Sequence, residues 1–313
     1  MRWKGRRESN QVEDLRGNSG TGLGGGVAPL ALMAIFSRLG VKGTIVVVIL
    51  GLIVWKVFGI NPLAMLGGQS ATQQVSQPYQ ESAEDAQTRQ MVSVVLADTE
   101  DTWQQIFASA GKQYQKPMLV LFRNGVQSGC GAAQSAMGPF YCPADQKVYI
   151  DLSFFQQMRQ QMGISGDQQN SAENPNSNQA GDFAEAYVIA HEVGHHVQNL
   201  LGISSQVQQA RQQASETQGN ALSVRQELQA DCYAGVWAHH NQQRTQFLQA
   251  GDVEEAMDAA HKIGDDYLQK QARGYVVPDS FTHGTSQQRA RWFNTGLNTG
   301  DLNQCDTFNI PQL

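Results

Sequence analysis

The stretch AYVIAHEVGHHVQNLLG, residues 186–202, decides which fold and chemistry this chain is expected to have. It contains His-Glu-x-x-His. On an α-helix, residues four apart lie on one face, so His191 and His195 can direct two imidazoles at one metal ion. Glu192 lies beside that face, within reach of a water molecule held there. Zinc accepts two neutral imidazoles and a carboxylate and leaves a fourth position for water. The stretch therefore predicts a zinc hydrolase, most simply a peptidase.

The flanks of this stretch indicate a helix. Asp182 can cap a helix that runs through the apolar residues 183–190, and Gly202 follows its end. A chance occurrence of the motif, with two solvated histidines, is the alternative. A strongly apolar helix favours the metal site instead, because it would hold the ligands rigidly. His196 points elsewhere, and we expect it to pack or to support the site from outside.

A catalytic zinc usually takes a third protein ligand. The metzincin spacing would need a histidine at position 201, which is Leu201. A carboxylate from a later helix fits better: Glu227 is expected to bind the metal, and Asp231, one turn on, to accept the second N–H of a ligand histidine and fix its tautomer. A solvated acidic pair is the alternative, but the surrounding residues are apolar. Other candidate ligands, without supporting spacing, are His239, His240 and His261.

Composition and charge divide the chain of 313 residues into four parts. Residues 1–42 are basic and Gly-rich and predict a cytoplasmic tail. Residues 43–60 are apolar except for Lys56 and are long enough to span a bilayer as a helix. Residues 61–90 resemble a polar linker, and residues 91–313 are expected to form an α+β domain. A cleaved signal peptide or a buried core helix are the alternatives for residues 43–60.

The charges around residues 43–60 predict an orientation in the membrane. Basic residues concentrate before this segment, which by the positive-inside rule puts the amino terminus in the cytoplasm and everything after residue 60 outside. We therefore expect a single-pass protein of the bacterial inner membrane with a periplasmic catalytic domain. The formal net charge of −6 argues against nucleic acid as a partner. The sequence does not indicate an oligomeric state.

Four cysteines suit two disulfides in an oxidising compartment, and free buried thiols are the alternative. The simplest pairing is Cys130 with Cys142 and Cys232 with Cys305. The first bridge would staple the loop before a predicted hairpin. The second would tie the helix of Glu227 to the carboxyl-terminal tail.

The motif with its downstream E-x-x-x-D resembles the gluzincin metallopeptidases. More closely, the chain resembles the bacterial neutral zinc metallopeptidase family of YpfJ-like proteins over nearly its full length. The segments that carry this resemblance are MRWKGRRESNQVEDLRG, GPFYCPADQKVYIDLSFF, AYVIAHEVGHHVQNLLG, RQELQADCYAGVWAHH and SFTHGTSQQRARWF. The resemblance implies a membrane-anchored, zincin-like metallopeptidase domain.

Gluzincins of the CAAX prenyl protease type carry a downstream histidine and, six residues later, an arginine near the scissile carbonyl. His283 and Arg289 have this spacing here, although Gly284 stands where that pattern usually has proline. The resemblance implies that one of them donates to the oxyanion. A structural hydrogen bond and a surface ion pair are the alternatives.

These residues predict metal-assisted amide hydrolysis of peptides or proteins of the cell envelope. Zn²⁺ would polarise the carbonyl, and Glu192 would act as general base. The segment Lys147–Leu152 is expected to be an exposed strand edge that pairs with an extended substrate. A zinc-stabilised binding or scaffold module without turnover and a hydrolase of non-peptide amides are the rival interpretations.

Overall fold

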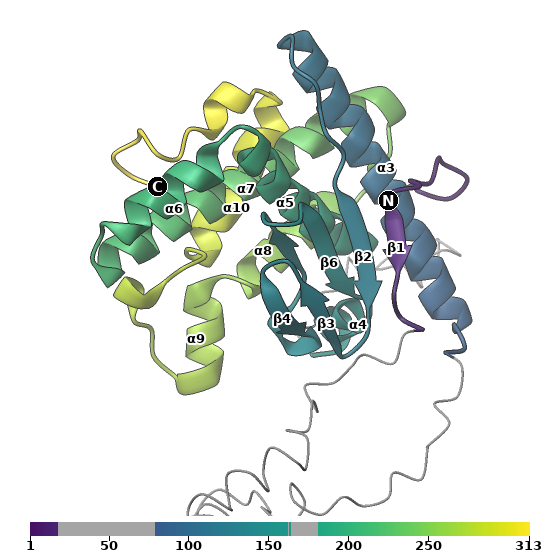
Figure 1. The fold of residues 1–313 in the computed structure, drawn as a ribbon, viewed down its shortest axis with the longest axis horizontal. Helices are drawn as coiled ribbons and strands as arrows, with labels where there is room; N and C mark the ends of the chain where they lie inside the picture. The colour runs from purple at the N-terminus through teal and green to yellow at the C-terminus, as the bar shows by residue number, and fades with distance from the viewer. Residues whose placement is uncertain (18–78, 162, 164–180) are drawn as a thin grey trace, which may run out of the picture. The chain divides into compact units, whose positions relative to one another are not determined.

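The computed structural model describes residues 1–17, 79–161, 163 and 181–313. Within them, residues 1–16 and 81–313 form one compact unit. Strands and helices both contribute to it, with a sheet beside a larger group of helices (Figure 1). The predicted α+β class is confirmed.

The main sheet has four strands in the order β1-β2-β6-β5. They are β1 (Val12–Asp14), β2 (Met118–Phe122), β6 (Lys147–Asp151) and β5 (Phe140–Cys142). β1, β2 and β6 are parallel, and β5 is antiparallel to β6. A separate antiparallel hairpin consists of β3 (Gly125–Ser128) and β4 (Gly131–Gln134).

The expectation that Lys147–Leu152 forms a strand edge was wrong. β6 is an interior strand, because its backbone pairs with β2 on one side and with β5 on the other. Val148, Tyr149 and Ile150 are all buried. The sequence of a strand does not show whether it lies inside a sheet or at its edge, because the topology of the whole chain determines which strands are its neighbours. The edge on this side of the sheet is β5.

The helices supply most of the unit. Their bounds are α3 (Ala83–Ser109), α4 (Ser153–Gln161), α5 (Asp182–Leu200), α6 (Ile203–Gln212), α7 (Glu216–Thr245), α8 (Asp252–Lys262), α9 (Asp265–Arg273) and α10 (Ser286–Thr299), with short 3₁₀ turns η1 (Ser135–Met137), η4 (Pro278–Ser280) and η5 (Leu302–Cys305). α8 and α9 follow each other closely in the sequence but are two separate helices. They separate at Gly264, where a Cβ would lie 2.5 Å from the Ser286 nitrogen, so the chain bends there beneath the start of α10.

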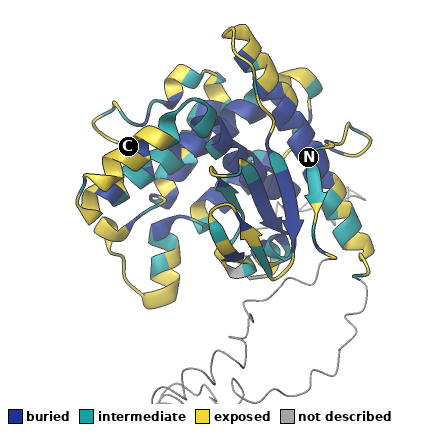
Figure 2. Cartoon of the chain, in the orientation of Figure 1, coloured by how far each residue is buried: buried dark blue, intermediate teal, exposed yellow. Residues whose placement is uncertain are grey.

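α5, α7 and α10 form the core of the helical part. A Cβ on Gly235 of α7 would overlap the Phe293 carbonyl of α10, and one on Gly296 would overlap the Cys232 carbonyl. These two glycines therefore allow α7 and α10 to approach closely. Fully buried aromatic side chains pack around this contact, among them Trp237 against Phe183. Figure 2 colours the inner stretches of these helices as buried. Burial of this apolar surface holds α5 and α7 rigidly against each other.

Residues 1–16 pack as part of this unit, whereas the sequence predicted that they belong to a separate tail. Trp3 is 2% exposed and lies in the main core cluster. Arg6 forms an ion pair with Asp98 of α3 at 2.6 Å. β1 then pairs with β2, which adds a strand to the sheet. The basic character of this segment is matched by acids of α3, a complementarity that the local sequence does not reveal.

The predicted membrane helix at residues 43–60 lies outside the described residues. Among the helices that the structure describes, none is both long and apolar enough to cross a bilayer. A single crossing between residues 17 and 80 would place β1 and β2 on opposite sides of a membrane. β1 and β2 pair in this structure, and the membrane segment with its orientation stays a prediction.

Candidate metal centre

α5 and α7 carry the centre between them. Gly194, inside the His-Glu-x-x-His motif, lies against α7: a Cβ there would sit 3.0 Å from the Ala230 carbonyl oxygen. The glycine thus lets the two helices approach at the level of the ligands. The local sequence makes α5 a helix, and the close contact with α7 brings a second set of side chains to its histidines.

His191, His195 and Glu227 converge on one point. The Nε2 atoms of His191 and His195 lie 3.2 and 3.5 Å from the same oxygen, Oε2 of Glu227. Their ligand atoms all lie within 4.8 Å of one another. Two imidazole nitrogens and one carboxylate oxygen facing a common point fit a zinc ion with one position left open. The three residues that sequence spacing predicted as ligands are therefore brought together.

Asp231 lies behind His191. Its Oδ1 accepts from Nδ1 of His191 at 2.8 Å and from the Tyr187 hydroxyl at 2.5 Å. The carboxylate is completely buried, and Arg289 pairs with both of its oxygens at 2.9 Å. Burial alone would raise the pKa of Asp231, but Arg289 and His191 outweigh it and lower that pKa. The ionised Asp231 holds His191 with Nε2 toward Glu227.

His195 has a neutral partner instead. Its Nδ1 lies 2.9 Å from Oε1 of Gln198, three residues further along α5. The Gln198 amide nitrogen donates to the Gln226 carbonyl at 2.7 Å and to Oε1 of Gln229 at 3.1 Å. Gln198 and Gln229 were not among the predicted site residues. The helical spacing of His195 and Gln198 was the available signal.

The charges of the centre favour a cation between its ligands. Burial opposes the protonation of His191, yet Asp231 and Glu227 outweigh it and raise the His191 pKa to about 10. Burial likewise opposes the ionisation of Glu227, but the two histidines outweigh it and hold its pKa well below 4.5. The surroundings therefore stabilise positive charge next to a carboxylate. A divalent ion would take the place of the protons.

Glu192 is buried beside the ligands. Burial is the main reason that its pKa lies above 4.5, and the two histidines only partly oppose this effect. A carboxylate of raised proton affinity next to a metal position suits a group that accepts a proton and passes it on.

His283 is close enough to the centre for the charge of Glu227 to affect it, and it is hydrogen-bonded to Asp265. Its Nδ1 lies 3.3 Å from Oδ1 of Asp265, and the side chain is 51% exposed. Oδ2 of Asp265 accepts from the backbone nitrogens of Thr282, His283 and Gly284 at 2.7, 2.6 and 3.0 Å. The Asp265 hydrogen bond raises the pKa of His283, and the charge of Glu227 acts in the same direction. Asp265, which lies 18 residues before His283, was not among the predicted site residues.

The backbone explains Gly284, where the related pattern has proline. Its φ is +91°, a conformation that proline cannot adopt and other L-residues rarely do. A Cβ there would also lie 3.2 Å from side chains of Leu228 and Val224 on α7. The backbone conformation and the packing of this turn therefore account for glycine in place of proline.

Arg289 lies behind the ligands, 3% exposed. Besides Asp231, its guanidinium contacts the Tyr187 hydroxyl at 3.3 Å and the Ile263 carbonyl at 3.4 Å. These contacts occupy all three of its nitrogens and give it a positioning role toward Asp231. They do not present it to a substrate carbonyl.

The remaining histidines lie elsewhere. His196 is fully buried and contacts the Tyr141 hydroxyl and the Gln115 carbonyl, in line with the expected packing role. His239 and His240 contact the carbonyls of Leu297 and Gly300 near the end of α10. His261 makes an edge-to-face contact with Tyr267.

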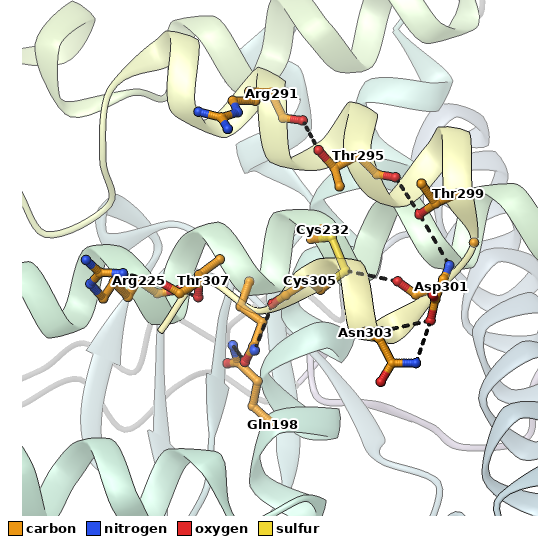
Figure 3. Close-up of a disulfide and its surroundings, with 12 residues drawn as sticks. Gln198, Arg225, Cys232, Arg291, Thr295, Thr299, Asp301, Asn303, Cys305 and Thr307 are labelled. Carbon is orange, nitrogen blue, oxygen red and sulfur yellow. Dashed lines mark hydrogen bonds between the residues drawn. A yellow bond between two sulfur atoms is a disulfide. The ribbon is translucent and has the colours of Figure 1, made fainter. Parts of the chain in front are cut away.

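Both predicted disulfides are present, Cys130–Cys142 and Cys232–Cys305. The first joins the tip of the β3–β4 hairpin to β5. The second joins α7, between Glu227 and its carboxyl-terminal end, to η5 (Figure 3).

A second cluster of potential ligands lies at the start of α5. Asp182, Asp252 and Glu255 are buried, with ligand atoms within 4.8 Å of one another. The amino-terminal ammonium of Met1 lies 2.7 Å from Asp182 and 3.1 Å from Asp252. Asp182 is the first residue of α5 and Gly181 is its cap, so the predicted capping role of Asp182 was wrong. Its carboxylate binds this cation instead.

An α+β domain whose helical His-Glu-x-x-His faces a carboxylate on a following helix has the ligand set of a zinc hydrolase. The chain belongs to the family described as "Putative neutral zinc metallopeptidase", whose model matches residues 1–308. It is 50% identical over 308 residues to "Uncharacterized protein YpfJ" of Escherichia coli K12, covering 98% of this chain and 99% of that protein.

A second relative is less similar to this chain. "Uncharacterized protein Mb2605" of Mycobacterium bovis is 44% identical over 209 residues, or 64% of this chain and 65% of that protein. No solved structure matches the chain.

Proposed function

We propose that this protein is a zinc-dependent endopeptidase of the bacterial cell envelope, with Glu192 as general base. One observation carries the proposal: both ligand histidines turn Nε2 toward Glu227 while their Nδ1 atoms have separate partners. A pair of solvated histidines needs no such bracing. A braced, partly open ligand set beside a buried carboxylate suits catalysis.

The donor set fits zinc in charge as well as in type. Arg289 already offsets the charge of Asp231, so the two positive charges of zinc would offset Glu192 and Glu227. Bound at His191, His195 and Glu227, zinc would polarise a scissile carbonyl and lower the pKa of an attacking water molecule.

The side chains around this position would divide the remaining work. Glu192 takes the proton from the attacking water and delivers it to the leaving amine, for which its raised pKa prepares it. His283, whose pKa the hydrogen bond with Asp265 raises, donates to the developing oxyanion. We assign Arg289 to the support of Asp231, on the basis of its contacts.

β5 is the strand best placed to bind an extended substrate. It forms the edge of the main sheet, and the hydroxyl of its Tyr141 contacts His196 and Asn199 of α5. A peptide that adds to β5 would run beside the metal helix. This arrangement favours a peptide over a small amide as substrate.

We also propose that the domain works in an oxidising compartment, since it contains two disulfides. Attachment to the inner membrane through residues 43–60, without a single crossing between β1 and β2, is part of this proposal. We infer that residues 1–16 lie on the same side of the membrane as the domain, because β1 pairs with β2. Exposed Lys4 and Lys112 offer sites for a test. Lys4→Cys and Lys112→Cys should both react with a membrane-impermeant maleimide in intact spheroplasts; labelling of Lys112→Cys alone would return the amino terminus to the cytoplasm.

The function is tested by comparing the amino-terminal proteome of cells that carry the wild-type chain with that of cells that carry Glu192→Gln. New amino termini that depend on Glu192, together with zinc in the purified protein, are the expected result. Zinc with no Glu192-dependent cleavage would favour the scaffold interpretation.

A further inference from the structure

Two glutamines connect the centre to the disulfide Cys232–Cys305. His195 contacts Gln198, Gln198 contacts Gln229, and the Gln229 amide nitrogen donates to the Cys305 carbonyl at 3.0 Å. Gln198 and Gln229 are both buried. Figure 3 labels Gln198 together with Cys305 and its bridge to Cys232.

Main-chain carbonyls determine which group donates and which accepts in this series of hydrogen bonds. A carbonyl can only accept, so the Gln229 amide nitrogen must face Cys305, and its oxygen is left for Gln198. The Gln198 nitrogen also faces the Gln226 carbonyl, which leaves its oxygen for Nδ1 of His195. Nδ1 must then carry the proton, and Nε2 of His195 is left with its lone pair toward Glu227.

The Cys305 carbonyl is itself held in place. The disulfide fixes Cys305 to α7. Just beyond it, the Thr307 hydroxyl donates to the Arg225 carbonyl at 2.6 Å, and Arg225 donates to the Ile310 carbonyl at 3.1 Å. The segment 302–310 is thereby bound to the helix that carries Glu227.

We propose that Gln198 and Gln229 are positioning residues that fix the metal-binding tautomer of His195, and that the Cys232–Cys305 bridge holds the carbonyl on which this order depends. The inference rests on the proposed zinc site. It extends that site to the carboxyl-terminal segment of the chain, and it assigns different jobs to the two disulfides.

Zinc affinity of the full-length protein tests the two glutamines. Gln198→Leu should weaken Zn²⁺ binding by about 10–100-fold in competition with a chromophoric chelator. Gln229→Leu should weaken it less, because Gln198 keeps the Gln226 carbonyl. Gln226→Leu is the matched control: it lies on the same helix and retains its carbonyl, while its side chain contacts Ser204. It should bind as wild type does.

A spectrum separates positioning from general damage. With Co²⁺ in the site, the visible bands should change in Gln198→Leu and not in Gln226→Leu, while thermal unfolding of the metal-free variants stays near that of wild type. Wild-type affinity and spectrum in Gln198→Leu would overturn the inference and leave the zinc site standing. A wild-type protein that does not bind zinc would instead remove the proposed function.

The two disulfides provide a second matched pair. Replacing Cys232 and Cys305 together by serine should reduce zinc affinity, as Gln229→Leu is expected to do. Replacing Cys130 and Cys142 together should leave zinc affinity unchanged, since that bridge lies in the β3–β4 and β5 region. Equal losses in both double variants, or no loss in the first, would contradict the role given to Cys232–Cys305.

Discussion

Two clusters of potential metal ligands lie along α5 and differ in what they are built to hold. Asp182, Asp252 and Glu255 gather at its start, and His191, His195 and Glu227 lie roughly 14 Å further along by the helical rise. In each cluster the ligand atoms are within 4.8 Å of one another. Proximity alone therefore does not distinguish them.

The difference is the source of the positive charge. The acidic cluster contacts the ammonium of Met1 and consists of oxygens only. In the metal centre, Glu227 forms its ion pairs with the two histidines, and within the described part of the chain it pairs with no lysine, arginine or amino terminus. An imidazole that is hydrogen-bonded through Nδ1 presents the lone pair of Nε2 to a metal ion, whereas the acids around Met1 neutralise its ammonium. The hydrogen bonds to Nδ1, and not the proximity of the ligand atoms, distinguish the metal site.

The largest expected effect separates the two clusters by zinc content. His195→Ala should lose most of the zinc, because two ligands rarely hold a catalytic ion tightly. Asp252→Asn should retain about one zinc per chain. Metal analysis of the purified full-length proteins checks both. Loss of zinc in Asp252→Asn, with zinc retained in His195→Ala, would contradict the assignment of the metal site.

The next effect is on turnover. Glu192→Gln retains the shape of the side chain and removes the base, so zinc and fold should survive while hydrolysis falls by roughly 10²–10⁴-fold. Asp182→Asn, at the other cluster of the same helix, should leave the rate per folded molecule near that of wild type. Peptide-library cleavage at matched zinc content measures both. Equal rates for Glu192→Gln and wild type would exclude Glu192 as the base.

A smaller effect is expected at the oxyanion side. His283→Ala should lose roughly 10²–10³-fold in kcat with zinc retained. Asp265→Asn should lose less, and it should move the alkaline limb of the pH–rate profile to lower pH, because Asp265 raises the pKa of His283. An unchanged profile would mean that Asp265 only shapes the turn.

The smallest effect is on the pH dependence of stability. Burial raises the pKa of Asp182 to about 7 and also raises those of Asp252 and Glu255. Folded molecules thus keep protons that unfolded chains release, so these acids destabilise the fold progressively as pH rises from about 4 to about 7. Asp252→Asn removes one of three mutually repelling acids and should flatten this decline. Melting temperatures of variant and wild type across that range provide the comparison, and parallel curves would contradict it.

The sequence predicted the parts of the site that depend on local periodicity. His191 and His195 are four residues apart on one helix, as are Glu227 and Asp231, and such spacings appear directly in the sequence. The disulfide pairs were also predictable, because four cysteines allow few combinations. Gln198 and Asp265 were missed because amides and acids are common, and nothing local marks one that faces a ligand.

The sequence by itself determined the chemistry available: a helix with two imidazoles and a base, a second helix with two acids, and an α+β domain to hold them. Only the tertiary structure decided how these groups are used. The close approach of α5 and α7 at Gly194 brings the ligands together, and the contact of α7 with α10 brings Arg289 within hydrogen-bond distance of Asp231. Segments distant in sequence, such as residues 1–16 beside β2 and Cys305 beside Gln229, meet because apolar burial selects one packing among many.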